Sequence, residues 1–153
     1  MIQRIQTLYL LLALVLMVLM FFFPFAEILS NEGMFYTFEF DGLHYINSEE
    51  VYVQTVPTII LLAMILGVNL VSVFLFKQRI VQMRLSFVNM ILMLGFIGLI
   101  YYYVRQFSGE LESVAVNYEL YNVLPFAAAI FTYLAIRAIG KDEALVRSID
   151  RIR

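Results

Sequence analysis

The sequence contains no cysteine and no tryptophan, only three prolines, and only 14% charged residues over its 153 positions. Without cysteine, the chain has neither disulfide bonds nor thiolate ligands for a metal. The charged fraction is well below the roughly 25% of typical soluble proteins. The formal net charge is −2, so there is no overall basic excess that would favour a nucleic acid as partner.

Hydrophobic residues make up 63% of the chain and gather in four long segments. These segments cover residues 5–26, 57–76, 85–104 and 118–137. A helix of about 20 residues, rising 1.5 Å per residue, crosses a hydrocarbon core about 30 Å thick. Backbone groups in lipid must find hydrogen-bond partners within their own segment. The sequence therefore predicts an all-α integral membrane protein, one domain over residues 1–153 with four transmembrane helices.

Lysine and arginine are segregated along the chain. Nine of the 10 basic residues precede the first segment, lie in the loop 77–84, or follow residue 136, and Arg105 is the exception. The loop 29–56 has no basic residue and five acidic ones. Because basic loops stay on the cytoplasmic side, we expect both termini in the cytoplasm and the loops 29–56 and 105–117 outside.

Three polar segments flank the expected helices. In the first outer loop, alternating aromatic residues precede Asp41-Gly42, which predicts a β-hairpin with a type I′ turn. The second outer loop, 105–117, is expected to be helical or irregular. In the tail, 138–153, Leu145, Ile149 and Ile152 share one helical face, which predicts a short amphipathic helix on the cytoplasmic leaflet.

Four polar residues fall within the second and third apolar segments: Asn69, Ser72, Ser86 and Asn89. Polar side chains at membrane depth commonly hydrogen-bond between helices, with a contribution of about 0.6–2 kcal/mol each. The alternative is that they line a transport path. We favour interhelical contacts because no ionisable side chain lies at membrane depth beside them.

Small residues recur in the same two segments, as Ala63 with Gly67 and as Gly95 with Gly98. Such spacing lets helices approach closely. The sequence leaves open whether this approach packs helices within one chain or joins two copies.

The chain contains one histidine, His44, in the first outer loop with Glu32, Glu39 and Asp41. One imidazole with scattered carboxylates is weak spacing for a metal site, so we expect solvated loop residues. No catalytic or nucleotide-binding motif occurs. We therefore expect no enzymatic activity, no cofactor and no metal.

Three blocks carry a family resemblance: "MIQRIQTLYLLLA", "FKQRIVQMRLSFVNMILMLGFIGL" and "KDEALVRSIDRIR". Together they resemble the domain-of-unknown-function 4293 family, small four-helix membrane proteins of the Bacteroidota, over nearly the whole chain. The resemblance implies a Gram-negative inner membrane, with the outer loops in the periplasm. It implies no activity, so no residue receives a role from it.

The blocks that carry the resemblance lie on the predicted cytoplasmic side, which suggests one assembled surface there. Its candidate residues are Arg4, Lys77, Arg79, Arg84, Arg147 and Arg151. We expect this surface to bind anionic lipid head groups, a membrane-protein partner or a second copy of the chain, and no nucleic acid. The leading function is thus a non-catalytic interaction or assembly subunit, and the alternative is a small transporter or channel, alone or as an oligomer, with an Asn- and Ser-lined path.

Overall fold

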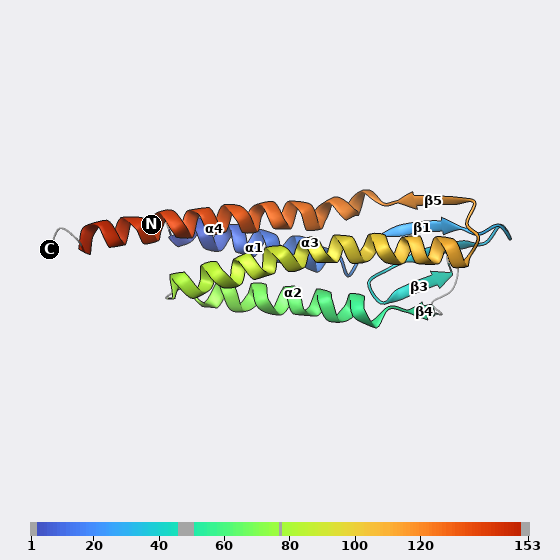
Figure 1. Ribbon diagram of the computed structural model, residues 1–153, viewed down its shortest axis with the longest axis horizontal. Helices are drawn as coiled ribbons and strands as arrows, with labels where there is room; N and C mark the ends of the chain where they lie inside the picture. The colour runs from blue at the N-terminus through green and yellow to red at the C-terminus, as the bar shows by residue number, and fades with distance from the viewer. Residues whose placement is uncertain (1–2, 46–50, 77, 151–153) are drawn as a thin grey trace.

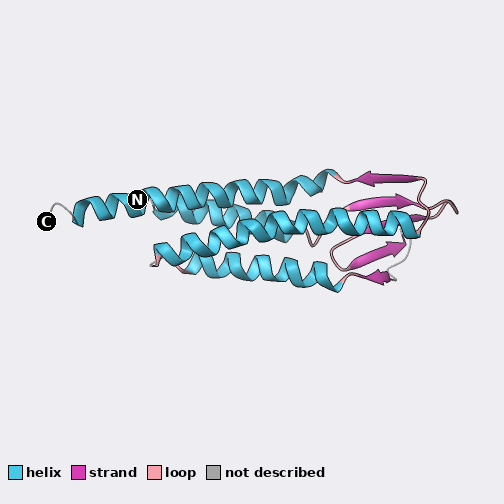
Figure 2. Cartoon of the chain, in the orientation of Figure 1, coloured by secondary structure: helices cyan, strands magenta, loops and turns pink. Residues whose placement is uncertain are grey.

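The computed structural model describes residues 3–45, 51–76 and 78–150, and the side chains of these ranges between residues 5 and 146. Helices form an elongated bundle, and short strands gather at one end of it (Figures 1 and 2). The elements are α1 Gln3–Leu19, β1 Ala26–Leu29, β2 Phe35–Phe38, β3 Gly42–Tyr45, β4 Val51–Gln54, α2 Val56–Phe74, α3 Arg79–Glu110, β5 Ala115–Tyr118, the 3-10 turn Leu120–Asn122, and α4 Val123–Asp150. We call the end with the strands the sheet end and the opposite one, where α1 starts and α4 finishes (Figure 1), the termini end.

Three of the helical segments are long and apolar enough to cross a membrane: Val56–Phe74, Arg79–Glu110 and Leu120–Val146. About a third or less of each apolar window is buried inside the protein. Their outward faces carry large exposed side chains such as Ile60 and Phe74. Such continuous apolar exposure is typical of a surface that faces lipid. The fourth helix, α1, is apolar but shorter, with 17 residues.

The bundle core follows a spacing of three and four residues, as in helices that pack side by side. On α2 the buried residues are Thr58, Leu62, Ile65, Asn69 and Ser72, and on α3 the stripe begins with Gln82, Ser86, Asn89, Met93 and Phe96. Between α1 and α4, small buried residues such as Ala13, Ala128 and Ala135 permit close approach. By contrast, Gly67 and Gly95 are exposed, and a Cβ at either would meet no atom within 4 Å.

The helix boundaries differ from the predicted ones at both ends of the bundle. The first helix ends at Leu19, and Ala26 already belongs to β1. Tighter turns with bonds three residues apart continue to Phe22, and Pro24 then disfavours helical geometry at Phe23. The third helix continues beyond residue 104 to Glu110. The predicted separate helix in the tail is wrong, since α4 runs without interruption to Asp150. No proline interrupts the chain after Pro125.

The expected hairpin is present as β2 and β3, but it belongs to a larger sheet. Five antiparallel strands lie in the order β4-β3-β2-β1-β5. The predicted type I′ turn is wrong because Asp41 does not adopt the positive φ that this turn requires. Gly42 is needed for another reason: a Cβ there would collide with the backbone oxygen of Val53. The loop 105–117, predicted to be helical or irregular, is helical up to Glu110 but also contains most of the strand β5.

The sheet packs one face on the extension of α3. Phe38 is fully buried, and its ring meets those of Phe25 and Phe107 edge-on with centroids 5.4 Å apart in each case. The Phe25 ring also contacts Phe96 in the bundle, at 5.8 Å. This aromatic column joins the sheet to the helical core, so the sheet and the last turns of α3 stabilise each other.

Candidate functional site

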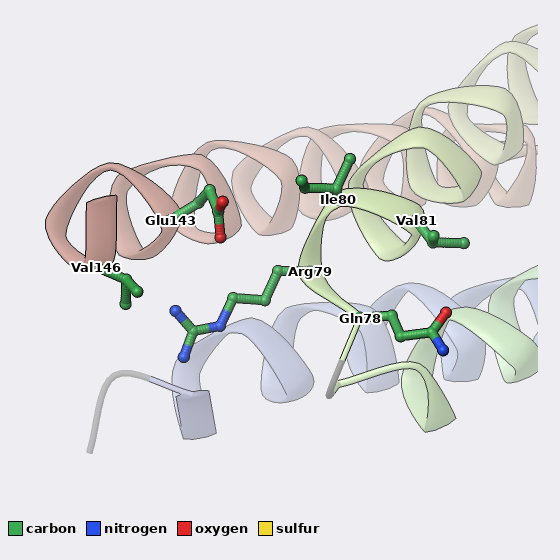
Figure 3. A pocket seen from close by; sticks show the side chains of 6 residues that line it. All are labelled: Gln78, Arg79, Ile80, Val81, Glu143 and Val146. Carbon is green, nitrogen blue, oxygen red and sulfur yellow. The ribbon is translucent and has the colours of Figure 1, made fainter. Parts of the chain in front are cut away.

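A groove opens at the termini end, between the first turn of α3 and the last turns of α4. Its volume is about 520 Å³. Figure 3 shows Arg79 reaching from the start of α3 toward the turns of α4 that carry Glu143 and Val146. The lining residues are Gln78, Arg79, Ile80, Val81, Glu143 and Val146. The groove therefore combines charged and apolar side chains, which suits a protein segment better than a free ion.

One ion pair ties the two sides of the groove together. The Arg79 guanidinium lies 3.1 Å from the carboxylate of Asp142, and the two side chains are only 22% and 13% exposed. The carboxylate oxygen in this contact is buried and is not aligned for a hydrogen bond. Partial burial weakens solvent screening, so removing one partner should cost more than at an exposed surface pair, because the other charge stays shielded and unpaired.

The groove contains only part of the predicted basic surface. Arg79 lines it but is paired, and Arg84 is exposed on α3. Lys77 and Arg151 lie outside the described residues, as do the side chains of Arg4 and Arg147. The described lining contains the carboxylate of Glu143 as well as the guanidinium of Arg79.

The apolar part of the lining is exposed. Ile80, Val81 and Val146 each expose about 40% of their surface. Val146 belongs to the last turns of α4, which continue past the other three helices at this end (Figure 1), and Ile80 and Val81 belong to the first turn of α3. Apolar side chains beside an ion pair form the kind of amphipathic surface on which a partner helix can lie.

The predicted polar residues inside the helices are all buried. Asn69, Ser72, Ser86 and Asn89 are each 0–1% exposed. The Ser72 hydroxyl donates to the Val68 carbonyl within its own helix, at 2.8 Å. Among the described residues, a side-chain hydrogen bond between α2 and α3 comes from a residue that the sequence analysis did not single out.

That residue is Gln82, 1% exposed, whose side-chain amide donates to the Ser72 carbonyl at 2.9 Å. A detectable signal existed, because Gln82 precedes Ser86 by four residues and Asn89 by seven. This places all three on one helical face. The predicted loop 77–84 excludes Gln82 from the third helix, whereas α3 begins at Arg79. Asp142 and Glu143 were missed in the same way, as residues of a separate tail.

Several buried polar atoms next to this bond have no partner among the described residues. They are both amide atoms of Asn69, the Ser86 hydroxyl and the Asn89 amide oxygen. Toward the sheet end the stripe continues with the apolar residues Ile65, Met93 and Phe96, and the polar Thr58 follows on α2. Two further buried polar side chains bond to backbone carbonyls of α4. Gln6 donates to the Ala138 carbonyl at 3.2 Å, and Thr132, which lies beside Met93, donates to the Ala128 carbonyl at 2.8 Å.

At the sheet end, folding gathers three of the four loop residues that the sequence singled out. Glu39, Asp41 and His44 each place one ligand atom within 4.8 Å of the others. Glu32 is elsewhere, in a polar cavity of about 330 Å³ that Tyr36, Tyr52, Glu110 and Glu112 also line.

The described fold is that of a helical membrane protein with a small antiparallel sheet at one end. The chain belongs to the family described as domain of unknown function DUF4293, whose model matches residues 2–152. This match confirms the family resemblance seen in the sequence. No curated protein matches the chain.

Proposed function

We propose that this protein is a non-catalytic interaction or assembly subunit of the inner membrane, and that its groove at the termini end receives a helical segment of another membrane protein. The observation that carries the proposal is the groove itself, with Ile80, Val81 and Val146 exposed beside the Arg79–Asp142 pair. Apolar contacts would supply affinity, and the charged pair would fix the partner's register.

The proposed topology has four transmembrane helices with both termini in the cytoplasm. The charge distribution supports it, because nine of the 10 basic residues belong to the termini end by chain position and only Arg105 belongs to the sheet end. In α1, the 17 helical residues rise about 25 Å. The Phe23 ring, beyond its end, stacks on Tyr121 with centroids 4.0 Å apart, which lengthens the apolar span. The sheet would then lie in the periplasm.

The absence of cysteine makes the topology easy to test. Single-cysteine variants Asn31→Cys, at the sheet end, and Ala144→Cys, at the termini end, are both at exposed positions. In spheroplasts, an impermeant maleimide should label only the first, and should label both after the membrane is opened. Labelling of Ala144→Cys in intact spheroplasts would overturn the proposed orientation.

The groove is tested by purifying the tagged full-length chain from its native membrane in mild detergent, after crosslinking through a photoreactive residue at position 81, which lines the groove. We expect one stoichiometric crosslinked partner, which Val146→Arg removes. Ala144→Arg is the matched control, because this exposed position is on the same turn of α4 but does not line the groove. Equal loss in both variants, or no stoichiometric crosslink, would contradict the groove proposal.

Lipid and self-association are separate outcomes of the same experiment. If anionic head groups alone occupy the groove, crosslinks form to lipid. If a second copy occupies it, the crosslinked species has twice the chain mass. Replacing the exposed Arg84 with Lys keeps the charge and loses the planar guanidinium, so unchanged partner recovery in this variant would show that charge alone suffices there.

The alternative function is a small transporter or channel, alone or as an oligomer. The unpartnered atoms of Asn69, Ser86 and Asn89 favour it, since buried polar groups without partners often bind water. Against it, Met93 and Phe96 follow on the same stripe toward the sheet. A liposome flux assay with Asn69→Leu and Asn89→Leu separates the two functions: a transporter loses flux, whereas an assembly subunit keeps its partner.

A further inference from the structure

A cluster of side chains of the types that can ligate a metal lies in the sheet, at the opposite end of the bundle from the groove. Glu39 follows β2, Asp41 lies in the turn, and His44 belongs to β3. Each offers one ligand atom, and the three atoms lie within 4.8 Å of one another. All three residues are partly buried. We propose that this triad binds a divalent transition-metal ion of the zinc class.

The donor set selects the class of ion. Zinc accepts imidazole nitrogen and carboxylate oxygen at about 2.0–2.2 Å, and three protein ligands with one open position are a common arrangement for it. Magnesium and calcium prefer sites made of oxygen alone, so the imidazole of His44 disfavours them. Donor atoms around a tetrahedral ion are about 3.3 Å apart, which small side-chain rotations would reach from the observed spacing.

The backbone already holds the three residues in place. The Glu39 N–H donates to the Gly42 carbonyl at 2.8 Å, and the Thr55 N–H donates to the Asp41 carbonyl at 2.9 Å. His44 pairs with Thr37 across the β2–β3 ladder. Since side chains alternate along a strand, Glu39 continues the face on which Thr37 and His44 lie. Binding would therefore require no rearrangement of the main chain.

Side-chain electrostatics also favour a cation at this position. The His44 Nε2 atom lies 2.9 Å from a carboxylate oxygen of Asp41, with Glu39 as a second carboxylate in the cluster. A cation between these atoms replaces the shared proton, and the neutral imidazole then carries its proton on Nδ1. The positive charge also offsets the repulsion between the two carboxylates.

An independent observation comes from the start of α2, which the turn contacts. Thr55 is 1% exposed, and its hydroxyl has no partner among the described residues. Its backbone is bonded to Asp41. Buried hydroxyls are normally hydrogen-bonded. The junction between the turn that carries Asp41 and the start of α2 therefore holds a buried polar group that lacks a partner among the described residues.

The test is isothermal titration of the full-length protein in mild detergent, after chelator treatment, with ZnCl₂ as the probe. We expect one equivalent bound, and at least a tenfold weaker Kd in each of His44→Gln, Asp41→Asn and Glu39→Gln. Glu32→Gln is the matched control, because Glu32 is an acidic residue of the same outer segment outside the triad. MgCl₂ and CaCl₂ should bind at least tenfold more weakly than ZnCl₂.

X-ray absorption of the zinc-loaded protein gives a second readout, and its wild-type spectrum does not depend on the variants folding. It should show one nitrogen donor from imidazole together with oxygen donors, and loss of the imidazole signal in His44→Gln. Zinc affinity that is unchanged in His44→Gln, equal losses in Glu32→Gln, or no imidazole signal in the wild type would each overturn the site.

Discussion

The guanidinium of Arg79, the first residue of α3, lies 3.1 Å from the carboxylate of Asp142, near the end of α4. This pair joins two segments that are 63 positions apart in the chain (142 − 79) and forms part of the groove. Its two side chains are mostly shielded from solvent. The geometry of the proposed partner site therefore depends on one electrostatic contact, whose loss should be measurable.

We predict that Arg79→Gln and Asp142→Asn each lower the free energy of unfolding by about 1–3 kcal/mol, because each leaves a shielded charge without its partner. The double variant should lose less than the sum of the two single losses. Thermal unfolding in mild detergent ranks the stabilities of the wild type, the two single variants and the double variant. Additive losses would show that the two side chains do not interact in solution.

The Gln82 side chain should contribute measurably to the contact between α2 and α3. Gln82→Met removes its bond to the Ser72 carbonyl and should cost roughly 0.5–1.5 kcal/mol. The matched control is Gln78→Met, one turn earlier, since Gln78 is exposed and its side chain makes no capping hydrogen bond. If both variants unfold at the same temperature as the wild type, the buried bond contributes nothing.

Two glycine-to-alanine substitutions should affect stability differently, one at Gly42 in the sheet and one at Gly67 on the surface of α2. Gly42→Ala forces a methyl group against the backbone of β4, and we expect a loss of roughly 1–3 kcal/mol, as for other overpacked positions. Gly67→Ala adds a methyl group in open space on α2 and should be neutral or stabilising by up to about 1 kcal/mol. Stability is measured as above. A loss at Gly67 of the size expected at Gly42 would indicate that this helix surface is covered.

Tyr36 gives the sheet a dependence on alkaline pH. Burial, followed by a hydrogen bond with Tyr45, raises the pKa of Tyr36 from 10.0 to about 12. The unfolded chain therefore releases this proton first, and stability should fall as the pH rises from about 10 to about 12. Burial raises the pKa of Tyr118 as well. Absorbance at 295 nm should therefore show late-titrating tyrosine, and Tyr36→Phe should remove the component near pH 12. Titration of every tyrosine near 10 would contradict this prediction.

Local pattern in the sequence was sufficient for the apolar helices, the hairpin position and the family. Runs of apolar residues and the alternation before Gly42 are local signals, and each depends on a spacing of a few residues. The burial of Asn69 and Ser86 also follows from local pattern. The spacing of three and four residues between the apolar residues around them defines the inner face of each helix.

Only the tertiary structure decided which segments meet. The last turns of α3 beyond residue 104 are helical where Phe107 packs on Phe38. The strands β1 and β5 pair although more than 80 residues separate them in the chain. Arg79 forms an ion pair with Asp142, which is equally a contact between distant segments. Short strands and single charges carry little signal of their own, because their stability comes from partners distant in the chain. The candidate groove exists only after the distant segments α3 and α4 come together, whereas the triad of Glu39, Asp41 and His44 forms within the β2–β3 hairpin once its turn geometry is set.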